Sequence, residues 1–118
     1  MAKYMILIYG DAGQWDAMSE EQWKAHNTGH AAFVDEAGAR VHDGRQLETA
    51  PGGHVVARGR ERPGPHHRRP VPGDRGRLGG YYLLDAADLD EVLEPAGLLS
   101  ELNHTHSALE IRPVVEHG

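Results

Sequence analysis

The chain has 118 residues, no cysteine and a formal net charge of −6 with histidine neutral. This length predicts one domain, residues 1–118, with a modest hydrophobic core. The absence of cysteine excludes disulfides, thiol nucleophiles and thiolate metal sites, and the negative charge argues against nucleic acid as a partner. The apolar run before Gly10 is too short for a signal or membrane segment, so we expect a cytoplasmic protein.

The first third of the sequence predicts a strand, a loop and a helix. Residues 3–9 form a short apolar run of β-prone residues, and residues 10–18 have the composition of a loop. Ser19 and Gln22 fit a capping box at the start of a helix that should end before Gly38. The residues at helical spacing that should share its inner face are Trp23, His26, His30, Phe33, Val34 and Ala37.

The middle of the chain predicts three further strands. Residues 40–49 and 54–58 resemble a pair of strands, and the Pro-Gly-Gly sequence at residues 51–53 predicts the turn between them. Residues 80–84 (GYYLL) predict the third of these strands.

The last third of the sequence predicts a second helix and a final strand. Asp88 fits the N-cap of the helix, with Glu91 three residues later, and Pro95 should keep this helix short or kinked. Residues 108–115 predict the last strand, in which Pro113 favours an edge or a late position.

The order of these elements is β-α-β-β-α-β, which predicts an α+β domain of the ferredoxin-like, split βαβ type. Two helices then cover one face of an antiparallel sheet, and the other face needs a cover as well. In so short a chain a second copy can provide that cover. We therefore expect a homodimer with its sheets packed face to face.

Residues 58–77 (RGRERPGPHHRRPVPGDRGR) differ in composition from both flanks. This stretch holds seven of the 12 Lys and Arg residues and four of the seven prolines. It has three possible origins: a basic binding arm for polyanions, a flexible lid, or a stretch translated in another reading frame. Because proline cannot donate ladder hydrogen bonds, we expect an irregular loop here if the protein has this sequence.

Several flanking segments carry a resemblance to a known family. The segments KYMILIYGD, GHAAFVDEAGARV, LGGYYLLDAADLDEVLE and LEIRPVVEHG together resemble the YCII-related family with the DGPF motif, over nearly the whole chain. The resemblance implies a dimeric α+β barrel with a small-molecule cleft. In that family a His–Asp pair in the cleft has been proposed as the active site.

The chain departs from this family at the DGPF motif itself. Where the family has TDGPF-x-ET before LGG, residues 67–74 read HRRPVPGD, with the spacing to LGG unchanged. In a GC-rich gene the codons for these residues, read one base later, admit Thr-Asp-Gly-Pro-Phe-Pro-Glu-Thr. We therefore hypothesise that residues 58–77 are encoded in a shifted frame between two compensating insertions or deletions.

The catalytic candidates are His30, His26 and Asp11. His30 matches the His of the family's HxxF pattern and should lie on the inner helix face, where an imidazole can exchange a proton near neutral pH. His26 lies one helical turn earlier; such a pair can also bind a metal, but the sequence offers no third ligand nearby, so we expect no metal. Asp11 follows the first strand and can approach the cleft, although a role as a turn residue explains it better.

Other polar residues have structural alternatives. Asp35 and Asp43 are candidates to orient a histidine, but five residues separate Asp35 from His30, which turns it to another helix face. His104 and His106 form a possible metal half-site if the backbone there is extended.

The substrate-binding candidates are Tyr9, Tyr82 and Arg112, which lie on predicted strands. Strand alternation sends Tyr82 to the opposite face from Tyr81, so one of the two can line the cleft. Arg112 can clamp an anionic substrate or pair with an acid such as Glu110.

These residues and the resemblance favour a small-molecule-binding homodimer, with His30 as general acid or base in lyase- or isomerase-type chemistry and no cofactor. The alternative is a non-catalytic ligand-binding protein, or a regulatory protein associated with transcription. Loss of turnover with retained ligand binding in a His30→Ala variant separates the enzyme from these alternatives.

The reading-frame hypothesis makes a prediction about the coding DNA. Read one base later across residues 58–77, the DNA should encode a DGPF-like run at residues 67–74, a few residues before LGG. Sequencing the gene across residues 55–80 checks this, and a shifted frame without that run contradicts the hypothesis.

Overall fold

The computed structural model describes residues 2–48, 54–57, 67–70 and 77–117. In this part of the chain no helix is long and apolar enough to cross a membrane. The elements in chain order are β1 (Ala2–Gly10), α1 (Ala12–Asp16), α2 (Glu20–Ala37), the 3-10 helix η1 (Gly38–Arg40), β2 (Val41–Gln46), β3 (His54–Ala57), β4 (His67–Pro70), β5 (Arg77–Ala86), α3 (Asp90–Ala96), the 3-10 helix η2 (Ser100–Asn103) and β6 (Ala108–Pro113).

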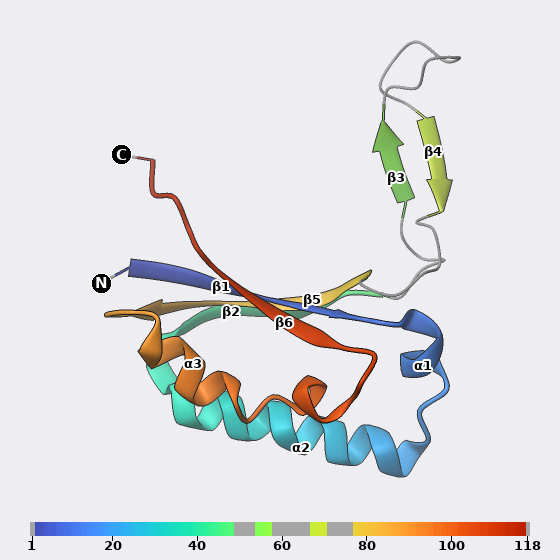
Figure 1. Cartoon of the computed structure of the whole chain (residues 1–118), viewed down its shortest axis with the longest axis horizontal. Coiled ribbons are helices and arrows are strands. Elements are labelled where there is room, and N and C mark those ends of the chain that lie inside the picture. The colour runs from blue at the N-terminus through green and yellow to red at the C-terminus, as the bar shows by residue number, and fades with distance from the viewer. Residues whose placement is uncertain (1, 49–53, 58–66, 71–76, 118) are drawn as a thin grey trace.

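The main sheet has four antiparallel strands in the order β2-β5-β1-β6, and β3 pairs with β4 in a separate two-stranded sheet. Helices α2 and α3 lie along one face of the main sheet (Figure 1). The fold is therefore α+β, as the order of elements predicts. The central strands β1 and β5 are joined over nearly their whole lengths, with one irregularity between Ile8 and Tyr9.

Local signals at both ends of α2 act as predicted. The Ser19 hydroxyl accepts a hydrogen bond from the Gln22 N–H, and the Gln22 side chain accepts one from the Ser19 N–H, which completes the capping box. The helix ends at Gly38, whose φ of 58° lies in the left-handed region that favours glycine.

The loop predicted for residues 10–18 is wrong in part, because α1 lies inside it. Asp11 caps this short helix, and its carboxylate accepts a hydrogen bond from the Gly13 N–H. The helix turns the Trp15 side chain into the core, where it is 6% exposed. A five-residue helix has too few residues to show an amphipathic period, so only the cap could have indicated it.

The irregular loop predicted for residues 58–77 is also wrong in part. Residues 67–70 form β4, in register with β3 from His54 opposite Pro70 to Ala57 opposite His67. Pro70 is the last residue of this strand, a position where a missing N–H is tolerated. Arg77 already belongs to β5. Residues 58–66 and 71–76 lie outside the described residues, as does the turn predicted at residues 51–53.

The short second helix is confirmed, and an arginine replaces the hydrogen bond that its proline cannot make. Asp88 accepts a hydrogen bond from the Glu91 N–H, as expected of a cap, although the helix begins at Asp90. Pro95 has no N–H to donate to the Glu91 carbonyl four residues earlier. The Arg40 guanidinium donates to that carbonyl instead, at 3.3 Å.

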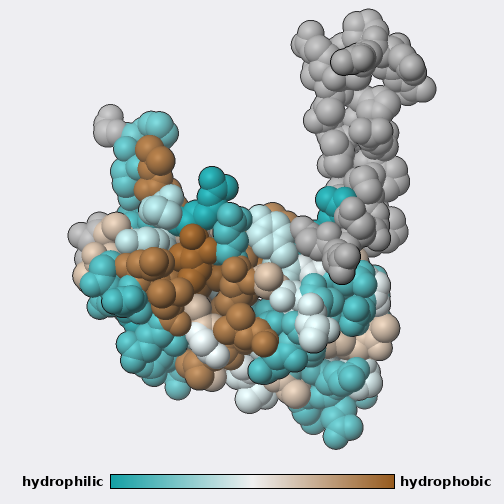
Figure 2. All heavy atoms as spheres, viewed as in Figure 1, coloured by the Kyte–Doolittle hydropathy of each residue, from teal (hydrophilic) through white to brown (hydrophobic). Residues whose placement is uncertain are grey.

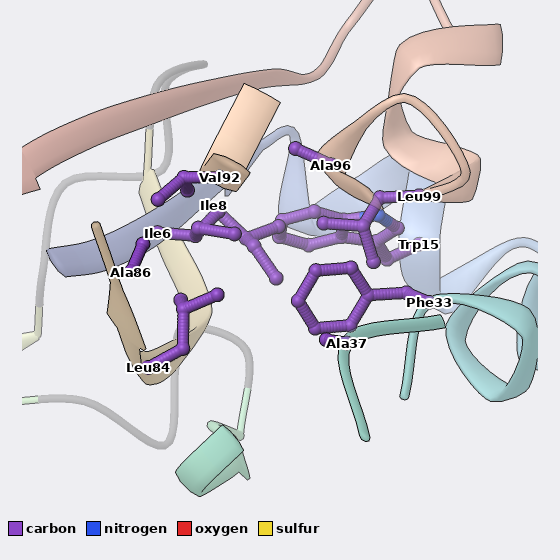
Figure 3. Packing of buried hydrophobic residues seen from close by; sticks show 10 residues of the cluster. All are labelled: Ile6, Ile8, Trp15, Phe33, Ala37, Leu84, Ala86, Val92, Ala96 and Leu99. Carbon is purple, nitrogen blue, oxygen red and sulfur yellow. The ribbon is translucent and has the colours of Figure 1, made fainter. Parts of the chain in front are cut away.

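The core lies between the sheet and the helices. Side chains from β1, β5, α2 and α3 converge there, with Phe33, Ile6 and Leu84 fully buried (Figure 3). One residue predicted for the inner face of α2 is misplaced: Val34 is 44% exposed, because the buried face follows the series His26, Phe33 and Ala37.

Apolar side chains also remain at the surface in two places. On the sheet face away from the helices, Met5, Leu7 and Leu83 alternate with buried residues and are themselves half-buried. Around α3, hydrophobic residues gather on the face seen in Figure 2. The exposed leucines of α3, its flanking turns and η2 are Leu89, Leu93, Leu98 and Leu102.

Candidate functional site

Two histidines of α2 and one glutamate of η2 meet at a single oxygen atom. His26 and His30 lie one turn apart, and their Nε2 atoms are 3.0 and 2.8 Å from Oε2 of Glu101. Glu101 is 2% exposed and His26 is 7% exposed, so the contact is almost dry. A buried carboxylate needs hydrogen-bond donors, and the two ring N–H groups provide them.

The turn that leads into η2 packs closely against the backbone of α2 at Gly29. A Cβ at Gly29 would collide with the Ser100 hydroxyl and come within 2.9 Å of the Leu98 carbonyl oxygen. The Ser100 hydroxyl in turn donates a hydrogen bond of 2.8 Å to the His26 carbonyl. Glycine is therefore required where the turn before Glu101 packs against the helix, and this close approach brings the carboxylate to the histidines.

Glu101 is held in its ionised form. Burial acts to raise the pKa of this carboxyl, but the hydrogen bonds from His26 and His30 and the charge of His30 outweigh it and lower the pKa to about 2. Its second oxygen, Oε1, and the Nδ1 atom of His26 are buried without a hydrogen-bond partner among the described residues.

Tyr82 extends the contact toward the sheet. Its hydroxyl lies 2.7 Å from Nδ1 of His30, the ring nitrogen opposite the one that contacts Glu101. With the Nε2 proton directed at the carboxylate, Nδ1 accepts the Tyr82 O–H. Burial, followed by the negative charge of Glu101, raises the pKa of Tyr82 above its ordinary value, so the phenol keeps its proton near neutral pH. The result is a hydrogen-bonded chain from Tyr82 through His30 to Glu101.

This chain forms part of the wall of a cavity of about 450 Å³ between α2 and the sheet. Trp15 and Trp23 contribute aromatic surface, and Arg45, Gln46 and Glu48 contribute polar groups at the end of β2. The volume suits a small organic molecule. The other lining residues are Ile8, Asp16, His26, Asn27, Gly44, Leu47, Gly79, Gly80 and Tyr81.

The cavity owes its shape to glycines on the strands. A Cβ at Gly79 would strike the Trp15 ring, and one at Gly44 would strike the Tyr82 ring. Because neither glycine has a side chain, both aromatic rings can lie flat against the neighbouring strand. Tyr82, which belongs to β5, can therefore lie in the cavity wall beside Gly44.

Three of the six predicted site residues line the cavity or contact its wall groups: His30, His26 and Tyr82. Asp11 lies elsewhere, because it caps α1 and its N–H donates to Nδ1 of His106 at 3.1 Å. This is the turn role that the sequence left open for Asp11.

Tyr9 and Arg112 lie on the sheet face away from the helices. The Tyr9 hydroxyl donates to Glu110 at 3.2 Å, and exposed Arg112 shares that face with Glu110. Glu110 lies opposite Leu7 in the β1–β6 register, so the Tyr9–Glu110 hydrogen bond is a diagonal contact between the two strands.

The candidate orienters of a histidine also lie away from the cavity contacts. Asp35 is exposed on α2, and Asp43 accepts a hydrogen bond from the Tyr81 hydroxyl at 3.1 Å. Glu101 takes the orienting role instead. Its only sequence signal is its position two residues after the Leu98-Leu99 pair, which is weak evidence of burial.

The same three side chains could hold a metal ion. One ligand atom each from His26, His30 and Glu101 lie within 4.8 Å of one another. The His104 and His106 rings lie close together, 5.3 Å between centroids, but Nδ1 of His106 is occupied by the Asp11 N–H. Burial, and then the charge of His104, lower the pKa of His106.

The sequence matches no protein-family model and no curated protein.

The ionised state of Glu101 predicts an acid-dependent stability. Because its pKa is lower in the folded protein than the ordinary 4.5, its ionised form stabilises the fold above that pH, and this contribution is lost as the pH falls toward 2. A fall in pKa of this size corresponds to about 3 kcal/mol. Glu101→Gln should therefore be less stable than wild type at pH 7 and show a flatter fall in unfolding free energy between pH 5 and pH 2.

Urea unfolding at several pH values, in buffer with a chelator, measures this difference. Glu36→Gln, at an exposed position of α2, is the matched control and should follow wild type. Parallel pH profiles for wild type and Glu101→Gln would contradict the ionised, buried carboxylate.

Proposed function

We propose that this protein binds a small organic molecule in the cavity beside α2 and transfers a proton on it, in lyase- or isomerase-type chemistry without an organic cofactor. The observation that carries this proposal is the chain from the Tyr82 hydroxyl to His30 Nδ1, and from His30 Nε2 to the Glu101 carboxylate, on the cavity wall. The raised pKa of Tyr82 keeps the phenol protonated and the lowered pKa of Glu101 keeps the carboxylate ionised, as a relay through His30 requires.

Tyr82 is the group that contacts the substrate. Its oxygen takes a proton from the substrate as its own proton passes to Nδ1 of His30, which becomes an imidazolium. The Glu101 carboxylate stabilises that cation at 2.8 Å and fixes the orientation of the ring. Return of the proton to another atom of the substrate completes an isomerisation, and return to a leaving group completes an elimination.

The sequence resemblance supports the same assignment. The histidine of the HxxF pattern is His30, and its neighbour in space is an acidic residue, as in the His–Asp pair proposed for the YCII-related family. We infer that the chain is a divergent relative of that family with a ferredoxin-like fold, because the strand order β2-β5-β1-β6 is the order of a split βαβ sheet.

Hydrogen exchange from a carbon acid tests the proton transfer directly. A panel of small hydroxy acids, keto acids and phenols is first screened by thermal shift, and stabilising compounds are then incubated with enzyme in D₂O. Wild type should catalyse deuterium incorporation at one carbon, measured by NMR. Tyr82→Phe and His30→Gln should each slow it at least ~100-fold while the thermal shift remains.

His42→Gln is the matched control, since His42 lies on the exposed side of the sheet and pairs with Asp85. It should exchange deuterium at the wild-type rate. Binding without exchange in wild type would instead favour the ligand-binding or regulatory alternative.

We also propose a homodimer in which the sheets of two copies pack face to face, giving an α+β barrel. The support is the half-buried centre of the outer face, where Met5 and Leu7 of β1 lie beside Leu83 of β5. An apolar sheet face that is only half-buried favours contact with another surface.

The dimer proposal predicts the effect of a charge at that centre. Leu7→Asp should shift the protein from dimer to monomer in sedimentation velocity, because it would bury a carboxylate in the interface. Leu93→Asp, at an exposed leucine of α3, should leave the dimer intact. A wild-type monomer, or dissociation by Leu93→Asp alone, would contradict this arrangement.

A further inference from the structure

The two histidines of α2 and Glu101 have the composition and spacing of a metal site as well as of a proton relay. Histidines four residues apart on a helix present their rings on one side, as in helical metal pairs, but a pair alone lacks a third ligand. Glu101 supplies it from η2, 71 residues beyond His30 in sequence. Imidazole and carboxylate ligands together are typical of Zn²⁺ and of other divalent transition metals.

The distances fit an ion after a small outward movement. Ligands at 2.0–2.1 Å in a tetrahedron lie about 3.3 Å apart. The two Nε2 atoms are 3.0 and 2.8 Å from Oε2 of Glu101, so each of these distances must lengthen by a few tenths of an ångström, and all three ligand atoms already lie within 4.8 Å of one another. The unpartnered Oε1 gives Glu101 a second oxygen with which to bind.

We propose that His26, His30 and Glu101 form a binding site for a divalent transition metal ion such as Zn²⁺, with an open coordination position that faces the cavity. All three residues line that cavity, which leaves room for a water or an anionic group as the fourth ligand. In the bound state each ring carries its proton on Nδ1. The His30 Nδ1–H then donates to the Tyr82 oxygen, the kind of outer contact that orients a ligating histidine.

The metal site and the proposed proton relay share His30 and Glu101, but Zn²⁺ binding can be measured without any turnover. The ion uses the same ring nitrogens as the relay, so the two states exclude each other in one molecule. His26 Nδ1 has no acceptor among the described residues, so only the His30 ring is held by a hydrogen bond from its non-ligating nitrogen. We therefore expect an ion that a chelator removes readily.

Equilibrium dialysis of the chelator-treated full chain tests the site with Zn²⁺, and with Mg²⁺ for comparison. Wild type should bind one Zn²⁺ per chain and no Mg²⁺ at the same concentration. His26→Ala and Glu101→Gln should each weaken Zn²⁺ binding at least ~100-fold, and Tyr82→Phe about 10-fold. His42→Ala should bind as wild type does, because that histidine lies on the other face of the sheet.

Two further measurements show whether the loss of binding in a variant reflects misfolding, and whether other histidines bind the ion. X-ray absorption of zinc-loaded wild type should show two imidazoles and oxygen ligands. The double variant His104→Ala/His106→Ala should keep the ion. Absence of Zn²⁺ binding by wild type, a ligand count without two imidazoles, or loss of binding only in the double variant would each overturn the site.

Discussion

The buried carboxylate of Glu101 is the constraint on which the rest of the site depends. A charge that is 2% exposed costs several kcal/mol unless strong donors surround it, and two histidines of α2 are those donors. The helix must therefore keep His26 and His30 on its inner face, and the turn before η2 must come close enough for contact. Gly29 and Ser100 meet that second requirement, because one lacks a side chain and the other bonds to the helix backbone.

The parts of the fold that could be predicted are those with local causes. Ser19, Gln22 and Gly38 define α2 because a capping box and a left-handed glycine act within a few residues of themselves. The carboxylate partner of the histidines could not be predicted, since 71 residues separate Glu101 from His30 and no periodicity links them. Strand β4 escaped prediction because prolines weaken the β pattern without excluding a strand that ends in one.

Strand alternation explains why some site residues were placed correctly and others were not. The sequence shows that Tyr81 and Tyr82 face opposite sides, but not which side holds the cavity. That choice follows from α2, which covers the face of Ile6, Ile8 and Tyr82 and leaves the face of Tyr9 outside. Tyr9 therefore bonds to Glu110 on the sheet surface, and Arg112 lies exposed on the same face; pattern alone cannot distinguish such positions from substrate-binding ones.

The strand order has a consequence for how the chain acquires its structure during synthesis. Central strand β1 leaves the ribosome first, yet its two neighbours, β5 and β6, begin only at residues 77 and 108. Until residues 77–86 emerge, β1 therefore has neither of its neighbours to pair with, and an unpaired apolar strand is prone to aggregation. Glu101 emerges between these two neighbours, so no shorter nascent chain can hold the histidine–carboxylate contact. The histidine–carboxylate contact can therefore form only after β5 has emerged, and the sheet can close only after β6.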